Sequence, residues 1–329
     1  MLILTADEVR KALPMKQAIV AMKQAYASLS GGTAVAPLRT SLSIPGSEAL
    51  SLFMPAYVSA QDGNALAVKV VSLFPGNPAR GFAFIQAAVL VFDAETGQTI
   101  ALLEGSSLTA IRTGAAGGAA VDLLARSDSK VAAIFGAGAQ GRTQLEAACV
   151  ARPLETAFVY DADANRAKTF VDELRGRGSI PSDLRVASSA REAIEQADII
   201  CTATTSTTPV FEDRDVRPGT HISAVGSYTP DMQEVPAETL LRARIFIDSH
   251  TASMEEAGDL LKPIQAGLFD PSHICGELGE VVLGKIPGRG SPDEITYFKS
   301  VGIAVQDALA ARVALANARE MGLGTEVDF

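Results

Sequence analysis

The chain has 329 residues, 47% of them hydrophobic and 20% charged, with a formal net charge of −10 at pH 7. This length leaves room for about two domains with an ordinary globular core. The acidic balance argues against non-specific binding to nucleic acid or anionic membranes, both of which favour basic surfaces. No run of about 18 apolar residues occurs and no signal peptide opens the chain, so we expect a cytoplasmic protein without a membrane span. Cys149, Cys201 and Cys275 are scattered, which predicts free, buried thiols rather than a disulfide framework or a metal site.

The N-terminal third of the chain predicts one helix followed by several strands. Residues Ala6–Leu29 have helical spacing, with Thr5 and Asp7 as candidate caps. From residue 37 to 103 the pattern is strand-like and is interrupted by turns such as Asp62–Asn64, which predicts an antiparallel meander. The expected strands are 38–44, 49–58, 65–74, 87–93 and 100–105.

Strand and helix signals alternate from Ser106 onward. A helix over 106–124 comes first, and a long final helix begins after Gly302. Between them the alternation predicts a parallel sheet covered by helices, with a substrate cleft between this region and the N-terminal one. The expected strands are 131–135, 156–161, 184–187, 197–203, 221–225 and 244–248, and the expected helices are 140–151, 163–176 and 189–196.

A glycine-rich turn between the strand at 131–135 and the next helix predicts a dinucleotide site. Gly136 allows a tight turn, Gly138 lets a pyrophosphate approach the backbone, and Gly141 lets the helix pack on the sheet. Asp161 ends the second strand, where a carboxylate accepts bonds from ribose hydroxyls. The alternative is a glycine-rich turn with no nucleotide. The Ser/Thr-rich stretch 202–208 suits a loop over the dinucleotide, but also any solvated loop.

Three basic residues are the candidates for substrate chemistry. Lys69 lies in the middle of an apolar strand, where an inward-facing ammonium would require an anion, a carbonyl or an imine nearby. The pattern equally permits an outward-facing lysine. Arg112 lies among small residues at a helix start, which suits bidentate capture of a carboxylate or phosphate, although a structural salt bridge is the alternative. Arg39 is a weaker candidate alone. His221, His250 and His273 lack metal spacing or a triad partner and are expected to be structural.

Six ordered motifs resemble the ornithine cyclodeaminase/μ-crystallin family over nearly the whole chain. They are residues 53–56, 68–81, 108–117, 136–141, 224–234 and 300–308. The resemblance implies a Rossmann-type doubly wound parallel sheet at 120–303, inserted in a mixed α/β dimerisation and substrate domain formed by 1–119 and 304–329. It also implies a homodimer that uses NAD(H) or NADP(H).

The resemblance further implies the site residues. The substrate-carboxylate and catalytic positions of the family map onto Arg39, Lys69 and Arg112, with Lys69 and Arg112 as the catalytic pair. The implied substrate-binding set is Arg39, Met54, Lys69, Arg112, Tyr228 and Gly302. The implied cofactor-binding set is Thr113, Gly136, Ala137, Gly138, Ala139, Gln140, Gly141, Asp161, Asp163, Arg166, Thr202, Ala203, Thr204, Val225, Gly226, Ser227, Ser300, Val301 and Gly302.

Two departures from the family pattern indicate the reaction. Cyclodeaminases carry carboxylates at the positions of Leu52 and Tyr228, and neither residue here is a base at neutral pH. We therefore expect an NAD(P)H-dependent reductase of small cyclic α-imino acids, Δ1-pyrroline-2-carboxylate or Δ1-piperideine-2-carboxylate, giving L-proline or L-pipecolate. The alternatives are an alanine dehydrogenase-type enzyme, then an ornithine cyclodeaminase, then a non-catalytic binder of NAD(P) and a small ligand.

The cofactor preference depends on opposing charges after the second strand. Asp161 and Asp163 should repel the 2′-phosphate of NADP, whereas Arg166, beside Asn165, could neutralise it. Two carboxylates against one guanidinium predict NADH over NADPH by a factor on the order of ten.

Overall fold

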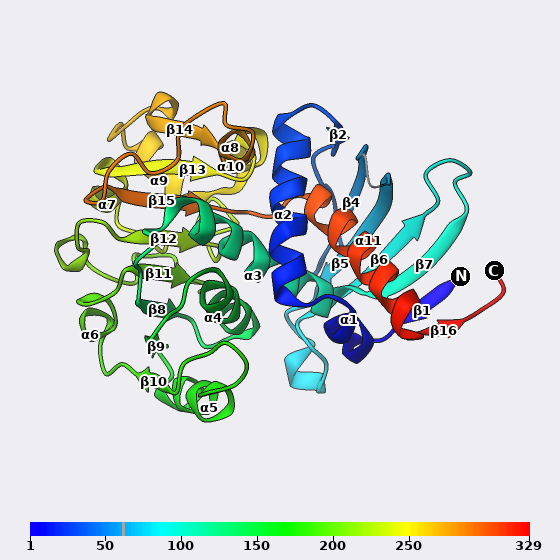
Figure 1. The fold of residues 1–329 in the computed structure, drawn as a ribbon, viewed down its shortest axis with the longest axis horizontal. Helices are drawn as coiled ribbons and strands as arrows, with labels where there is room; N and C mark the ends of the chain where they lie inside the picture. The colour runs from blue at the N-terminus through cyan, green and yellow to red at the C-terminus, as the bar shows by residue number, and fades with distance from the viewer. Residues whose placement is uncertain (61–62) are drawn as a thin grey trace. The chain divides into compact units, whose positions relative to one another are not determined.

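The computed structural model describes residues 1–60 and 63–329, so Asp62 of the predicted turn lies outside the described residues. The chain forms two compact units. Unit 1 comprises Met1–Arg112 and Ile303–Phe329, and unit 2 comprises Thr113–Gly302. The boundary between them falls within helix α3 (Gly105–Leu124), and Figure 1 labels the elements of each unit.

Unit 1 is built on a mixed sheet in the order β16-β1-β7-β6-β5-β4-β2, with β3 also paired to β4. Strands β3 to β7 pair antiparallel in succession, which confirms the predicted meander. The sequence pattern missed β1, which pairs parallel with β7, and β16, which pairs antiparallel with β1. The strands are β1 (Leu2–Leu4), β2 (Ala34–Val35), β3 (Thr40–Ser43), β4 (Leu50–Val58), β5 (Ala65–Leu73), β6 (Ile85–Phe92), β7 (Thr99–Glu104) and β16 (Thr325–Glu326).

Two N-terminal helices replace the single helix expected over Ala6–Leu29. Helix α1 (Ala6–Ala12) ends before Pro14, and α2 (Met15–Ser30) begins after it, because proline has no N–H to continue a helix and restricts the preceding residue. Thr5 is the N-cap of α1, as predicted, and its backbone N–H and hydroxyl both donate to Glu8 Oε2. A short 3₁₀ helix, η1 (Pro78–Arg80), lies between β5 and β6.

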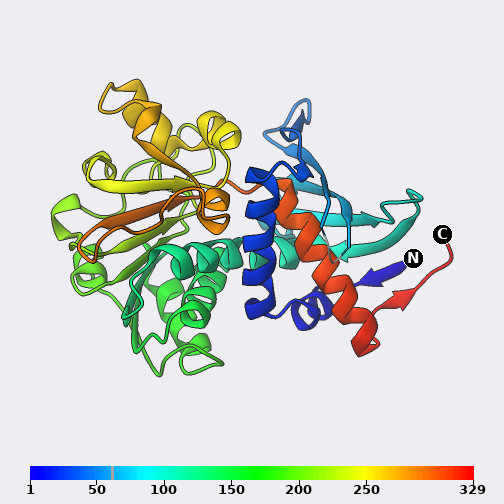
Figure 2. The same ribbon diagram turned by 45° about the horizontal axis from the view of Figure 1, so that its top comes forward.

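The final helix of unit 1, α11 (Ala304–Met321), packs against α2 and on strands β4, β5 and β6. Figures 1 and 2 show α11 and α2 side by side. Eleven of its eighteen residues are buried, so α11 is the core helix of the unit. Among them are Gln306 and Asp307, two polar residues in an otherwise apolar run.

Unit 2 has an all-parallel sheet in the order β10-β9-β8-β11-β12-β15-β13-β14. Its first five positions have the 3-2-1-4-5 order of a Rossmann fold, which confirms the predicted fold class. The pattern missed β15 and β14, whose sequences mix apolar with polar, charged or glycine residues and lie next to charged or glycine-rich loops. The strands are β8 (Val131–Phe135), β9 (Thr156–Tyr160), β10 (Asp183–Val186), β11 (Ile199–Thr202), β12 (His221–Ala224), β13 (Ala243–Ile247), β14 (Ile274–Glu277) and β15 (Ile295–Lys299).

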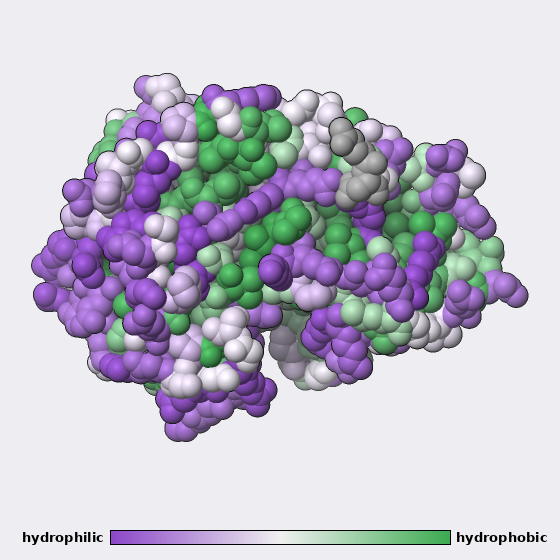
Figure 3. Space-filling model, in the orientation of Figure 1, coloured by the Kyte–Doolittle hydropathy of each residue, from purple (hydrophilic) through white to green (hydrophobic). Residues whose placement is uncertain are grey.

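Close contact between α3 and α4 requires two glycines. A Cβ atom at Gly114 would lie 2.5 Å from the carbonyl oxygen of Thr143, and one at Gly117 would lie 2.0 Å from Gln144 Oε1. The remaining helices are α4 (Ala139–Ala151), α5 (Ala164–Leu174), α6 (Ala190–Ile194), α7 (Ala237–Leu241), α8 (His250–Glu256), α9 (Gly258–Gln265), α10 (Leu278–Val282), η2 (Asp213–Asp215) and η3 (Pro271–His273). Figure 3 shows the polar outer face of α5.

Two further observations concern membrane association and thiols. Within residues 1–60 and 63–329, no helix combines the length and apolar character that a membrane crossing needs. Cys149 and Cys201 are buried free thiols, and burial raises the pKa of each to about 12. Cys275 is exposed, so the expectation of burial was wrong for this residue, which lies at an outer strand.

Candidate functional site

Lys69 points into the core of unit 1. It lies on β5 on the same face as Ala65, Ala67 and Val71, and its side chain is only 2% exposed. The neighbouring strands place Met54 and Val89 opposite it. The lysine is therefore inward-facing, and a buried ammonium requires a partner.

A carboxylate on α11 is that partner, and it also holds Arg112. Asp307 Oδ2 lies 2.8 Å from Lys69 Nζ, and Asp307 Oδ1 accepts from Arg112 Nε at 2.9 Å. Arg112 Nη1 donates to Gln306 Oε1 at 2.8 Å. We call Lys69, Arg112, Gln306 and Asp307 the unit 1 charge cluster. Among the described residues, the hydrogen bonds of Arg112 run from Nε and Nη1, which leaves Nη2 for a ligand oxygen.

The position of Arg112 differs from the sequence expectation. It lies two turns into α3 rather than at the helix start, and it makes the salt bridge that the sequence left as an alternative. Arg112 is 5% exposed and Asp307 is 1% exposed. Because both guanidinium and ammonium share one carboxylate, the cluster keeps a net positive charge that can receive an anion.

The charge cluster perturbs the pKa of Lys69. Burial and the positive charge of Arg112 lower this pKa, Asp307 opposes both effects, and the net pKa is about 8. Half-buried Arg39 also lowers the pKa, which places a third cation within electrostatic reach of Lys69. Three of the predicted substrate residues thus influence one another in unit 1.

Sequence reasoning missed Asp307 and Gln306 as site residues. Both lie in the motif 300–308, and both are buried in α11 among alanine, valine and leucine. The available signal was an acid and an amide side by side in the core-facing run of a helix, because such residues are seldom buried without partners.

The glycine turn after β8 has the predicted geometry. Gly136 has φ +98°, and a Cβ atom there would lie 2.5 Å from the carbonyl oxygen of Ala203. A Cβ atom at Gly141 would lie 1.9 Å from the carbonyl oxygen of Gly136. At Gly138, the N-cap of α4, the nearest atom to a Cβ would be Arg166 Nη2 at 3.7 Å. The first and third glycines therefore allow close packing, while a Cβ at Gly138 would meet only the end of the exposed Arg166 side chain and no backbone atom.

Asp161 closes the turn from the second strand. Its Oδ2 accepts from the backbone N–H of Ala137 at 2.7 Å, and its Oδ1 accepts from that of Asp163 at 2.9 Å. Each carboxylate oxygen has a second lone pair that can still accept from a ribose hydroxyl. Asp163 caps α5 by accepting from Asn165 N–H. Arg166 is exposed beside the glycine turn.

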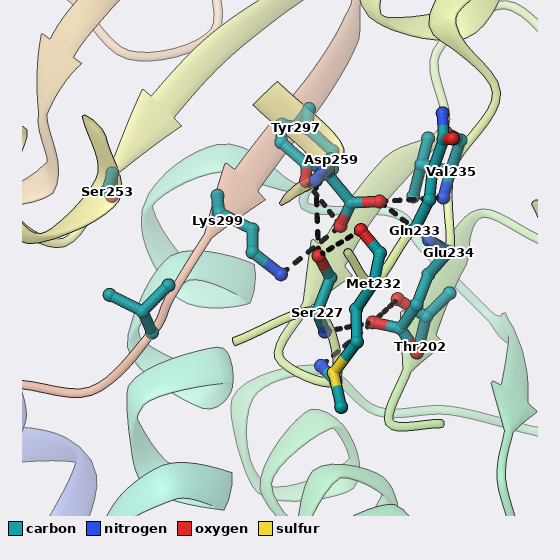
Figure 4. A network of polar contacts seen from close by, with 12 residues as sticks. Thr202, Ser227, Met232, Gln233, Glu234, Val235, Ser253, Asp259, Tyr297 and Lys299 are labelled. Carbon is teal, nitrogen blue, oxygen red and sulfur yellow. Dashed lines mark hydrogen bonds and ion pairs between the residues drawn. The ribbon is translucent and has the colours of Figure 1, made fainter. Parts of the chain in front are cut away.

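A buried glutamate, Glu234, joins the loops that follow β11 and β12 (Figure 4). Its Oε1 accepts from the N–H and hydroxyl of Thr204, and its Oε2 accepts from the hydroxyl of Thr202. The N–H groups of Gly226 and Ser227 also donate to Oε2, at 2.8 and 3.1 Å. Burial raises the pKa of Glu234, while Lys299 and the hydrogen bonds oppose that rise. One carboxylate thus holds four of the predicted cofactor residues in place.

Asp259 supports the segment that carries Glu234. Its Oδ1 accepts from the N–H groups of Glu234 and Val235, and its Oδ2 accepts from Tyr297 and Lys299, both at 3.2 Å. Figure 4 shows these side chains converging from α9, β15 and the Ser227–Val235 loop. Sequence reasoning missed this network because its members are separated along the chain.

A second buried acid, Asp248, holds the segment after β15. It accepts from the Ser300 hydroxyl and from the N–H groups of Val301 and Gly302, all at 2.8 Å. Gly302 has φ +82°, a conformation that favours glycine. All three residues were predicted to contact the cofactor, and the structure brings them together at the end of β15.

The other predicted residues occupy the same end of the unit 2 sheet or the adjoining helix. Ala139 and Gln140 begin α4, Ala203 and Val225 follow β11 and β12, and half-buried Tyr228 follows Ser227. The carbonyl of Thr113, in α3, accepts from Gln144 Nε2. No cluster of metal-ligating side chains occurs in the described part of the chain.

The sheet order and the glycine turn define a protein of the Rossmann dinucleotide-binding class. The chain belongs to the ornithine cyclodeaminase/mu-crystallin family, whose sequence profile matches residues 1–322. This confirms the resemblance inferred from the six motifs.

Three similar proteins illustrate the family. A Δ1-pyrroline-2-carboxylate reductase from Bacillus cereus is 39% identical over 100% of both chains. The structure of Thermococcus litoralis Δ1-pyrroline-2-carboxylate reductase in complex with NADH and L-proline is 42% identical, covers 99% of this chain and 100% of its own, and has a TM-score of 0.93. An archaeal alanine dehydrogenase dimer with bound NAD is 33% identical, covers 100% and 99% of the two chains, and has a TM-score of 0.92.

Proposed function

We propose that the chain is an NADH-dependent reductase of small cyclic α-imino acids, with Δ1-pyrroline-2-carboxylate as the principal substrate. Hydride adds to the carbon of the C=N bond and a proton adds to its nitrogen, which gives L-proline and NAD⁺. The observation that carries this proposal is the 42% identical relative that holds NADH and L-proline together. Leu52 and Tyr228 support a reductase over a cyclodeaminase, because neither side chain is a base at neutral pH.

Unit 1 is proposed as the substrate-binding unit. Arg112, through Nη2, and Arg39 bind the substrate carboxylate and orient the imine. Lys69 binds the carboxylate or the imine nitrogen and supplies or relays the proton. The net positive charge of the unit 1 charge cluster supports this assignment, since a buried surplus of cations calls for an anionic ligand. Met54, Tyr228 and Gly302 complete the proposed substrate set.

Unit 2 is proposed as the NAD-binding unit, with the pyrophosphate at the N-terminus of α4. That placement is supported by the absence of crowding backbone at Gly138 and by the free N–H groups of the first helical turn. Asp161 accepts from the adenosine ribose, and the loops held by Glu234 and Asp248 line the rest of the cofactor. Here the cofactor, when bound, supplies the hydride, and these residues supply its position.

We further propose a homodimer formed through the open face of the unit 1 sheet. Helix α11 covers one face of strands β4 to β6, and the alternate residues of these strands point to the other face. That face carries Phe53, Pro55, Val68, Val70 and Leu90, which are half-buried or exposed. Such a continuous apolar surface is characteristic of an interface, and a 33% identical relative is a dimer. We also propose a cytoplasmic location, where an exposed free thiol such as Cys275 stays reduced.

The reaction is tested by following NADH oxidation with several substrates. We expect rapid turnover of Δ1-pyrroline-2-carboxylate, slower turnover of Δ1-piperideine-2-carboxylate, and weak activity on pyruvate with ammonia. Ammonia release from L-ornithine with NAD should stay at background. A dominant rate with pyruvate and ammonia would favour an alanine dehydrogenase, and steady proline production from ornithine would favour a cyclodeaminase.

A further inference from the structure

Asp307 contacts both cations of the unit 1 charge cluster. Asp307 Oδ2 lies 2.8 Å from Lys69 Nζ, and Asp307 Oδ1 lies 2.9 Å from Arg112 Nε. We propose that Asp307 is a positioning residue, which holds Lys69 in its protonated form and aims the Arg112 guanidinium at the substrate carboxylate. This inference rests on the proposed reductase function. It names a residue that controls the protonation of Lys69 and the orientation of Arg112 in the proposed substrate site.

The surroundings of Asp307 favour a fixed, charged carboxylate. It lies in the first turn of α11, an eighteen-residue helix whose positive dipole end stabilises a negative charge there. The adjacent Gln306 uses Oε1 to accept from Arg112 Nη1 and from the N–H of Ile303, and uses Nε2 to donate to Tyr26. Because Gln306 is held on three sides, α11 presents Asp307 and Gln306 to Arg112 as one rigid acceptor pair.

The charges around Lys69 explain why this carboxylate matters. Arg112 from α3 and Arg39 from the segment before β3 both repel a protonated Lys69, and Asp307 from α11 is the anion that faces it. The flanking strands contribute the apolar Met54 and Val89. Without Asp307, the Lys69 ammonium would lose the carboxylate that raises its pKa while Arg112 and Arg39 still lower it, so Lys69 would lose its proton at a lower pH.

The experiment compares the pH dependence of kcat/KM for Δ1-pyrroline-2-carboxylate in the wild type, D307N, D307E and K69R. The wild type should lose activity as the pH rises through about 8, where Lys69 deprotonates. D307N should show this loss at least one pH unit lower, so that at pH 8 its kcat/KM is about tenfold below its own maximum. D307E restores the charge and should bring the midpoint back near the wild-type value. K69R should remove the alkaline loss, because arginine stays protonated.

A matched control neutralises another carboxylate near α3. Glu104 accepts from the N–H groups of Ser106 and Ser107 at the start of this helix, and E104Q should leave the alkaline midpoint in place. Titration of the substrate itself is common to all variants and cancels in the comparison. If D307N has the wild-type midpoint, or if K69R keeps the alkaline loss, the inference is wrong.

Two further measurements separate this inference from the proposed function. The Lys69 Nζ resonance, assigned with K69R, can be titrated by ¹⁵N NMR without substrate in the wild type and in D307N, so it tests Asp307 even if no imine is reduced. If D307N does not fold, the D307N/K69M pair should recover a folded protein, because it removes the Asp307 and Lys69 charges together and so keeps the net charge of the unit 1 charge cluster. A double variant as unstable as D307N would overturn the assignment.

Discussion

The two units differ in the sign of their buried charge and in how that charge is compensated. In unit 1, Lys69 and Arg112 share the carboxylate of Asp307, with Arg39 nearby, so cations exceed anions among these residues. In unit 2, Glu234 and Asp259 exceed Lys299, yet each carboxylate accepts at least four hydrogen bonds from the protein itself. The unit 1 residues therefore keep a positive charge that a ligand anion can neutralise. In the unit 2 network, which we call closed, the protein itself supplies the hydrogen bonds that the carboxylates accept.

From this difference we infer that the unit 1 residues form a binding site, whereas the unit 2 residues form a scaffold. A surplus of buried positive charge is costly unless a ligand anion completes it, which is why we assign the substrate carboxylate to unit 1. A closed carboxylate network has little left for a ligand, but it fixes the backbone segments that donate to it. In unit 2 those segments are the loops after β11, β12 and β15, where the predicted cofactor residues lie.

The substitution Arg112→Lys tests most directly whether the surplus positive charge of unit 1 binds the substrate carboxylate. Lysine keeps the charge, but its three N–H groups lie on one nitrogen and cannot reproduce the planar fork that reaches Asp307, Gln306 and a carboxylate. We expect kcat/KM for the imino acid to fall about 100-fold, which corresponds to about 3 kcal/mol of lost charged hydrogen bonding. The dissociation constant of NADH, measured by fluorescence titration, should change less than threefold. Wild-type kcat/KM in this variant would remove Arg112 from the substrate site.

The loss of stability at acid pH tests whether a buried histidine of unit 2, His221, limits the stability of the protein. His221 is buried against Thr296, and burial lowers its pKa from 6.5 to about 3. The unfolded state therefore binds the extra proton first, so stability present above pH 6.5 is lost as the pH falls toward 3. Between pH 7 and 5 the wild type should lose about 2 kcal/mol more unfolding free energy than H221N, as measured by urea denaturation. Equal losses in both proteins would assign the acid sensitivity elsewhere.

The substitution Glu234→Gln removes a hydrogen-bond acceptor from the unit 2 network without changing the size of the side chain. The amide NH₂ must face either Thr204 or the donors on Gly226 and Ser227, so at least one donor meets another donor. We expect the KM for NADH to rise about 20-fold, or about 1.8 kcal/mol, with the KM for the imino acid changed less than twofold.

The control for this variant is Glu212→Gln, because Glu212 is an exposed acid of the same unit that pairs with Arg214. It should leave both KM values unchanged. A parallel rise of both KM values in E234Q would indicate general loosening of the fold rather than a role in holding the cofactor loops.

Cofactor selection is the smallest expected effect. Wild-type enzyme should prefer NADH over NADPH about tenfold, and Asp161→Ser should reduce that ratio to about one. Asp163→Ser is the matched control, because serine can still cap α5 while one negative charge is lost nearby. Its effect on the kcat/KM ratio of the two cofactors should be smaller. Higher wild-type kcat/KM with NADPH would mean that Arg166 binds the 2′-phosphate.

Much of unit 2 could be predicted because its signals are local. The strand at 131–135, the turn at Gly136 and the helix that follows are encoded by adjacent residues, and the structure matches them closely. The prediction of a single N-terminal helix was wrong, because it followed the helical spacing of apolar residues across Pro14, where the helix is interrupted. Strand β15 was missed although it lies inside the sheet, because ITYFK mixes polar with apolar residues and ends in a charge.

The sequence by itself determined the fold class, the glycine turn and the family, since each depends on short spacings and ordered motifs. It also indicated Lys69 and Arg112 as polar residues in apolar surroundings, but left open which way the lysine points. Only the tertiary structure decided that Asp307, 195 residues from Arg112, joins the two cations, and that Glu234 holds loops from two strands. Hydrogen-bond partners so far apart leave no periodic trace in the chain, because packing of whole elements brings them together.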